Sequence, residues 1–126
     1  MKFRTLMVIK AIVCLVFGPL LLFFPDPLLT LLGSSYGPGA AITAREYGAA
    51  LLGNLMLTWI ARNAEASVAR RAIIWDLFVY DAVAFIAMLF IQLSGGLNLL
   101  GWGIVAIYLF FAAAFGYFLL PQRRVA

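Results

Sequence analysis

The apolar positions along the chain gather into four long runs. They extend from about residue 6 to 24, 41 to 61, 72 to 93 and 99 to 120, with short polar or Gly/Pro-rich breaks between them. A helix of about 20 residues crosses about 30 Å of hydrocarbon, so each run has spanning length. Because every backbone polar group must be paired in hydrocarbon, the runs predict helices rather than strands. The pattern therefore predicts an all-α transmembrane four-helix bundle that fills the single domain 1–126.

The basic residues lie almost entirely on one side of this four-span arrangement. Arg45 falls on the other side, whereas eight residues share the first side: Lys2, Arg4, Lys10, Arg62, Arg70, Arg71, Arg123 and Arg124. Basic loops remain in the cytoplasm during insertion. We therefore expect both termini and the 62–71 loop to be cytoplasmic, with segments 25–40 and 94–98 outside, in a bacterial inner membrane. A signal peptide is the alternative interpretation of the first run, but no small-residue cleavage site follows it directly.

The first outward segment contains a shorter helical pattern. Asp26 can cap a helix, Pro27 suits its first position, and Gly33 can end it after about two turns. The leucines between them are too apolar for open water. We expect a short interfacial helix that lies at the bilayer surface or folds back over the bundle.

Composition supports a membrane protein and narrows its chemistry. Hydrophobic residues make up 66% of the chain and charged residues 11%, whereas soluble domains average about 45–50% and about 25%. Histidine is absent and Cys14 is the single cysteine, which excludes intrachain disulfides, His/Cys zinc sites and histidine-ligated haem or pigment. We expect Cys14, within an apolar run, to be a buried thiol. The net charge of +4 does not indicate nucleic acid, because the basic residues follow the span boundaries.

One ionisable residue lies deep within a predicted span. Asp81 is near the centre of the third run, and Asn54 and Tyr108 are near the centres of the second and fourth. A charge at the centre of a spanning helix costs at least about 2.5–3.5 kcal/mol, so Asp81 needs a partner or a wet cavity. The three residues can converge as a candidate intramembrane polar site. Its role is either to hold a proton, cation or polar ligand, or to fix helix packing.

A second acidic residue of the third run lies nearer the cytoplasmic boundary. Lys10 and Asp76 share a depth, which predicts a structural ion pair between them. In the alternative, Lys10 reaches the headgroups and Asp76 accepts a hydrogen bond near its helix start. Asp76 and Asp81 are five positions apart, or about 140° around a helix, so they do not form a carboxylate dyad.

Two adjacent charged residues, Arg45 and Glu46, open the second run at the outer boundary. They point in directions about 100° apart and are poorly placed to pair with each other. Asp26 and Gln92 are candidate partners for Arg45. The pair is predicted to anchor the helix or to contact a lipid headgroup or a partner protein.

Small residues four positions apart occur in two of the runs. Ala49 and Gly53 form one such pair and Ala112 and Gly116 the other, and this spacing allows close helix contacts within the bundle or between copies. The chain has no phosphate-binding loop, no nucleophile paired with a base and no metal-ligand cluster. We therefore expect no enzymatic activity and no cofactor.

The chain resembles a broad group of small bacterial four-span integral membrane proteins that has no established activity. The resemblance is carried by the stretches FPDPLLTLLG, AREYGAALLGNLMLTWIAR and LGWGIVAIYLFFAAAFGYF. It extends over nearly the whole chain and implies architecture alone.

These observations favour a non-enzymatic protein that acts as a helix-packing scaffold or as an accessory subunit of a larger membrane complex, such as an energy-converting one. Its expected partners are the lipid bilayer and either other membrane subunits or further copies of itself. One alternative is a small ion or solute transporter or channel that uses Asp81. The other is a lipid or isoprenoid-cofactor binder with an aromatic groove and Arg45 or Glu46 at its polar mouth.

Overall fold

A computed structural model describes residues 2–33 and 38–120 of the protein. Within these residues the chain is all-α, as predicted. The elements are α1 (Phe3–Phe23), α2 (Pro25–Leu31), α3 (Pro38–Ile60), a 3-10 turn η1 (Ala61–Asn63), α4 (Val68–Leu93) and α5 (Gly101–Leu119). Arg123 and Arg124, which contribute to the predicted charge asymmetry, lie outside the described residues.

Three of the described helices, α1, α4 and α5, are long and apolar enough to cross a membrane. Helix α3 has 23 residues, but it carries Arg45, Glu46 and Asn54 and is not among the three. Helix α4 begins at Val68, ahead of the predicted start near residue 72, because the Ser67 side chain accepts a hydrogen bond from the Arg70 N–H and caps the helix. The chain thus has the make-up of a helical membrane protein.

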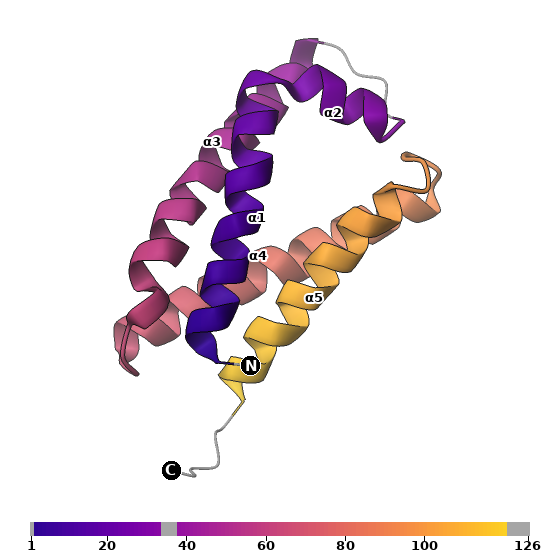
Figure 1. Ribbon diagram of the computed structural model, residues 1–126. Helices are drawn as coiled ribbons and strands as arrows, with labels where there is room; N and C mark the ends of the chain where they lie inside the picture. The colour runs from indigo at the N-terminus through magenta and orange to yellow at the C-terminus, as the bar shows by residue number, and fades with distance from the viewer. Residues whose placement is uncertain (1, 34–37, 121–126) are drawn as a thin grey trace.

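The long helices form two antiparallel pairs (Figure 1). Helix α1 packs along α3, and α4 packs along α5. The pairs come together at the end that holds the start of α1 and the end of α5, which we call the base. Away from the base they diverge, and α2 extends from the far end of α1 toward the α4–α5 loop. We call α2, together with Leu32 that follows it, the roof.

A cluster of buried apolar side chains holds the two pairs together at the base. It combines residues of α1, α4 and α5: Phe3, Leu6, Met7, Ile74, Leu77, Phe111 and Phe115. The rings of Phe111 and Phe115 stack with centroids 6.1 Å apart. Because lipid tails are as apolar as these side chains, close packing rather than removal from water stabilises the contact.

Helices α1 and α3 pack closely against each other at two glycines, Gly18 and Gly48. A Cβ atom on Gly48 would lie 2.6 Å from the Leu22 backbone nitrogen and 2.7 Å from the Gly18 carbonyl oxygen. No real Cβ fits at those distances, so the crossing requires glycine at position 48.

The two predicted pairs of small residues have different surroundings. Ala112 is buried and Gly116 packs against the Phe78 ring, so this pair joins α5 to α4. By contrast, Ala49 is exposed, and a Cβ on Gly53 would meet nothing within 4 Å. Ala49 and Gly53 therefore make no close helix contact within the described part of the chain.

The short helix predicted after the first run is present as α2, although its capping differs from the prediction. The helix begins at Pro25, its N-cap is Phe24 without a side-chain cap, and Asp26 lies inside the first turn. Pro25 takes the first helical position that was predicted for Pro27, because its fixed φ and missing N–H suit that place. Gly33 follows the helix with φ of 79°, in the left-handed region, as its predicted terminating role requires.

Candidate functional site

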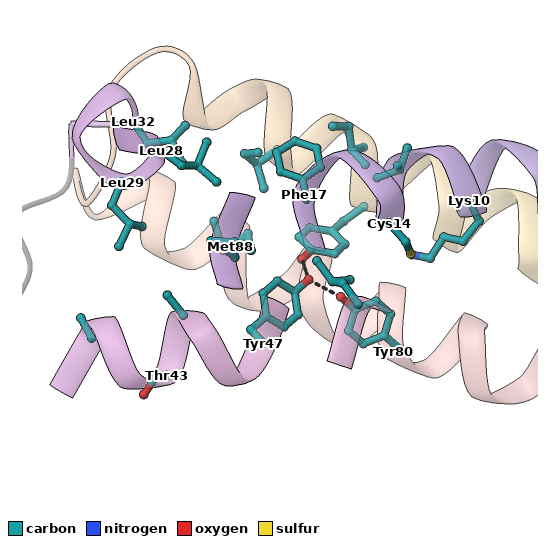
Figure 2. A pocket seen from close by; sticks show the side chains of 18 residues that line it. Lys10, Cys14, Phe17, Leu28, Leu29, Leu32, Thr43, Tyr47, Tyr80 and Met88 are labelled. Carbon is teal, nitrogen blue, oxygen red and sulfur yellow. Dashed lines mark hydrogen bonds between the residues drawn. The ribbon is translucent and has the colours of Figure 1, made fainter. Parts of the chain in front are cut away.

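A cavity of about 540 Å³ lies between the two helix pairs and below the roof (Figure 2). Its size falls within the range of about 300–1,000 Å³ that is typical of small-molecule sites. Leu28, Leu29 and Leu32 line it at the roof. The rest of its apolar wall comes from the four long helices: Val13, Cys14, Phe17, Leu21, Ala40, Ala44, Leu51, Met88, Ile104 and Ile107. Cys14 is buried, as predicted.

Three tyrosines from three different helices meet in this cavity. Tyr47 comes from α3, Tyr80 from α4 and Tyr108 from α5, and all three line the cavity. The Tyr47 hydroxyl is hydrogen-bonded to the hydroxyls of both Tyr80 and Tyr108. The dashed lines in Figure 2 mark these two bonds, which meet at the Tyr47 hydroxyl. We call these three residues the tyrosine cluster; it joins the two helix pairs by polar contacts across the cavity.

A buried ion pair lies next to the tyrosine cluster. The Lys10 ammonium of α1 donates a hydrogen bond of 2.7 Å to the Asp81 carboxylate of α4, and the two residues are 2% and 0% exposed. The ammonium also lies 4.8 Å from the centroid of the Tyr80 ring and 4.5 Å from that of Phe111. These contacts place it over aromatic faces, which attract a cation. The pair gives a countercharge to the deep acid that the sequence singled out.

This pairing corrects the predicted partner of Lys10, which was Asp76. Asp76 lies on the exposed face of α4, whereas Asp81 faces α1. The prediction matched depth along the helices, but the five-residue spacing turns Asp76 about 140° away from Asp81. The long Lys10 side chain reaches the deeper carboxylate. Among the described residues, Asp81 Oδ2 is buried without a hydrogen-bond partner.

The predicted site of Asp81, Asn54 and Tyr108 does not form as one hydrogen-bonded group. Asp81 pairs with Lys10, and Tyr108 belongs to the tyrosine cluster. Asn54 is half-buried, and its backbone carbonyl accepts a hydrogen bond from Thr58. Within residues 2–33 and 38–120, no hydrogen bond joins the Asn54 side chain to either of the other two. Each helix can rotate about its own axis without changing the depth of its residues. The shared depth of Asp81, Asn54 and Tyr108 therefore did not determine whether their side chains face one another.

Sequence reasoning missed two members of the tyrosine cluster, Tyr47 and Tyr80. Both are tyrosines within apolar runs, where a hydroxyl needs a partner. That signal was present, since Tyr80 directly precedes Asp81. The sequence pattern does not predict how α3 and α4 are rotated about their axes, and this rotation turns both rings toward Tyr108.

Arg45 and Glu46 lie away from the cavity. Arg45 Nη1 donates a hydrogen bond of 2.9 Å to the Leu22 carbonyl near the end of α1, and Glu46 is exposed. The candidate partners Asp26 and Gln92 are therefore corrected to a backbone oxygen, because the last carbonyls of a helix lack donors within the helix. Gln92 instead donates through Nε2 to the Asn98 carbonyl.

Comparisons with protein-family models, curated proteins and solved structures found no match to this chain. The protein is therefore described by its own features. Its described residues are all-α and include three helices long and apolar enough to cross a membrane, and its cavity has apolar walls and a tyrosine cluster with a buried ion pair beside it.

Proposed function

We propose that the protein binds a small amphipathic molecule from the bilayer in the cavity between its helix pairs. The observation that carries this proposal is a space of about 540 Å³ with apolar walls and converging polar groups. Such a pattern is typical of sites that bury a ligand and orient it through a few polar contacts. The proposal develops the lipid or isoprenoid-cofactor binder expected from the sequence, with the tyrosine cluster replacing Arg45 and Glu46 as its polar element.

The proposed setting is a four-span bundle in a bacterial inner membrane. Helix α3 packs along α1 and has spanning length, and its Arg45 finds a backbone acceptor on α1. The basic residues of the base, including Arg70 and Arg71, support a cytoplasmic position for both termini and for the loop after α3. The roof then lies at the outer interface, where its leucines meet the cavity.

The other functions expected from the sequence remain predictions. Transport through Asp81 gains no support from the geometry, since Asp81 is fully buried and paired with Lys10. A scaffold or accessory-subunit role draws on the outward side of α3, where Ala49 and Gly53 leave room for a helix of another chain.

The ligand proposal can be tested by filling the cavity. In Met88→Trp a larger side chain enters the cavity from α4, and in Ile86→Trp the same side chain lies on the exposed side of that helix. Native mass spectrometry of protein extracted gently from its own membranes should show a stoichiometric small molecule on the wild type and on Ile86→Trp. We expect Met88→Trp to carry about tenfold less, because overpacking costs about 1–3 kcal/mol.

Two results would contradict the proposal. The first is a wild-type protein without any bound small molecule in mild detergent. The second is equal occupancy in Met88→Trp and Ile86→Trp, which would place the bound molecule elsewhere.

A further inference from the structure

We infer that the ligand of this cavity presents an uncharged hydrogen-bond acceptor, a carbonyl oxygen such as that of a ketone or quinone, to the tyrosine cluster. The inference rests on the proposed function and specifies its ligand. Three features support it: the hydrogens of the cluster, the charge balance beside it, and the position of the apolar wall.

The tyrosine cluster can donate a hydrogen bond to an acceptor on the ligand. Three hydroxyl groups carry three hydrogens, and the two bonds made by Tyr47 use two of them. A ligand oxygen that enters the cavity can accept the hydrogen that these bonds leave over. The nearby Lys10 ammonium is engaged by Asp81 and by the faces of Tyr80 and Phe111. The hydroxyls, rather than the ammonium, are thus the donors that face a ligand.

The charge balance favours a neutral ligand. Lys10 is the one charged residue in the described lining of the cavity, and its charge is balanced by Asp81 at 2.7 Å. A ligand carboxylate would therefore add a net negative charge to a site of low dielectric constant. Burial of an unpaired charge is strongly unfavourable, whereas a neutral carbonyl needs only a hydrogen bond.

The apolar wall gives the ligand a direction. Leu28, Leu29 and Leu32 of the roof lie at the end of the cavity opposite Lys10, as Figure 2 shows. The tyrosine cluster lies between these two ends. A hydrocarbon chain attached to the carbonyl can therefore run from the cluster toward the roof against apolar side chains.

Three probes of equal carbon number test this inference: 2-tridecanone, tridecanoic acid and tridecane. Each is added at the same mole fraction to delipidated protein in nonionic micelles, at a pH where the acid is ionised, and bound probe is counted by native mass spectrometry. We expect the ketone to bind about fivefold more than the alkane, the gain of one typical hydrogen bond. The acid should bind less than the ketone.

Variants assign the preference to the cluster. In the triple variant Tyr47→Phe/Tyr80→Phe/Tyr108→Phe all three hydroxyls of the cluster are removed, and ketone binding should fall to the level of the alkane while alkane binding stays unchanged. If circular dichroism shows that the triple variant does not fold, the infrared carbonyl band of 2-tridecanone bound to the wild type tests the same contact. We expect this band at lower frequency than in empty micelles, and an unshifted band would overturn the inference. Tyr117→Phe removes a hydroxyl from an exposed position on α5 and should keep the ketone preference.

The outcomes separate this inference from the proposed function. Equal wild-type binding of ketone and alkane, lost in Met88→Trp, would overturn the inference and leave the cavity as a ligand site. Stronger binding of the acid would overturn the neutral character of the ligand. Failure of all three probes to bind the wild type would overturn both proposals.

Discussion

The base and the roofed half of this molecule are built from the same helices but have different interiors. At the base, α1, α4 and α5 meet through fully buried side chains such as Leu77 and Phe115. Toward the roof the helix pairs diverge, and the cavity lies between them. Lys10 lies at the border, since it lines the cavity while its ammonium lies over Phe111 of the base cluster.

In the proposed function, the base contributes most of the stability and the roofed half contributes the binding site. Within lipid, helices associate through packing and polar contacts rather than through exclusion of water. The packed base therefore holds the pairs together, and in the proposed function the roofed half accommodates the ligand. Changes at the base and at the border should affect stability more than equivalent changes around the cavity.

The largest effect is expected at the border. Lys10→Met leaves the Asp81 carboxylate buried without a counterion and should destabilise the protein by about 3–5 kcal/mol. The double variant Lys10→Met/Asp81→Leu should recover most of that loss, because an apolar pair of similar volume replaces the ion pair. Unfolding by added SDS in mixed micelles measures both.

Asp76→Asn, on the exposed face of α4, is the control and should change stability little. A double variant no more stable than Lys10→Met alone would show that the pair contributes more than mutual neutralisation.

The next effect compares the same substitution in the two halves. Phe115→Ala opens a void in the packed base and should cost about 3 kcal/mol, the lower end of the range for buried phenylalanines, because in lipid the loss is mainly of packing. Phe17→Ala removes a ring from the wall of an existing cavity and should cost less than half as much. The same SDS titration checks both, and equal losses would contradict a division between the halves.

The third comparison concerns the crossing of α1 and α3, and its larger loss is smaller than the larger loss in each of the two preceding comparisons. Gly48→Ala places a methyl group against the backbone of α1 and should destabilise the protein by about 2 kcal/mol. Gly53→Ala is the matched control, with open space around the new methyl group, and should be neutral or stabilising by up to about 1 kcal/mol. Equal behaviour of the two variants in thermal unfolding would mean that α1 and α3 do not depend on this close approach.

The sequence was sufficient for the helices but not for their relative rotation. Runs of apolar residues predicted the long helices to within a few residues, and the Pro25–Gly33 segment predicted the short one, because these signals are local. In helices that are apolar on all sides, however, periodicity does not show which face meets a neighbour. For this reason the prediction that Lys10 pairs with Asp76 was wrong, and Lys10 pairs with Asp81 instead.

The candidate site shows the same limit. Asp81 was singled out from its depth alone, and its need for a partner is met by Lys10. The tyrosine cluster depends on rings of three helices turning toward one point, which is a property of tertiary packing. The cavity depends on the divergence of the helix pairs, and no local sequence signal encodes it.

Asn98, in the α4–α5 loop, connects the roof to the opposite helix pair. Its backbone N–H donates to the Leu32 carbonyl and its Nδ2 donates to the Leu31 carbonyl, while its Oδ1 accepts from the Leu100 N–H within its own loop. In mechanical terms, the two helix pairs are beams fixed at both ends, by the packed base and by Asn98. The two helix pairs are thus connected at both ends of the cavity, by side-chain packing at the base and by the hydrogen bonds of Asn98 at the roof.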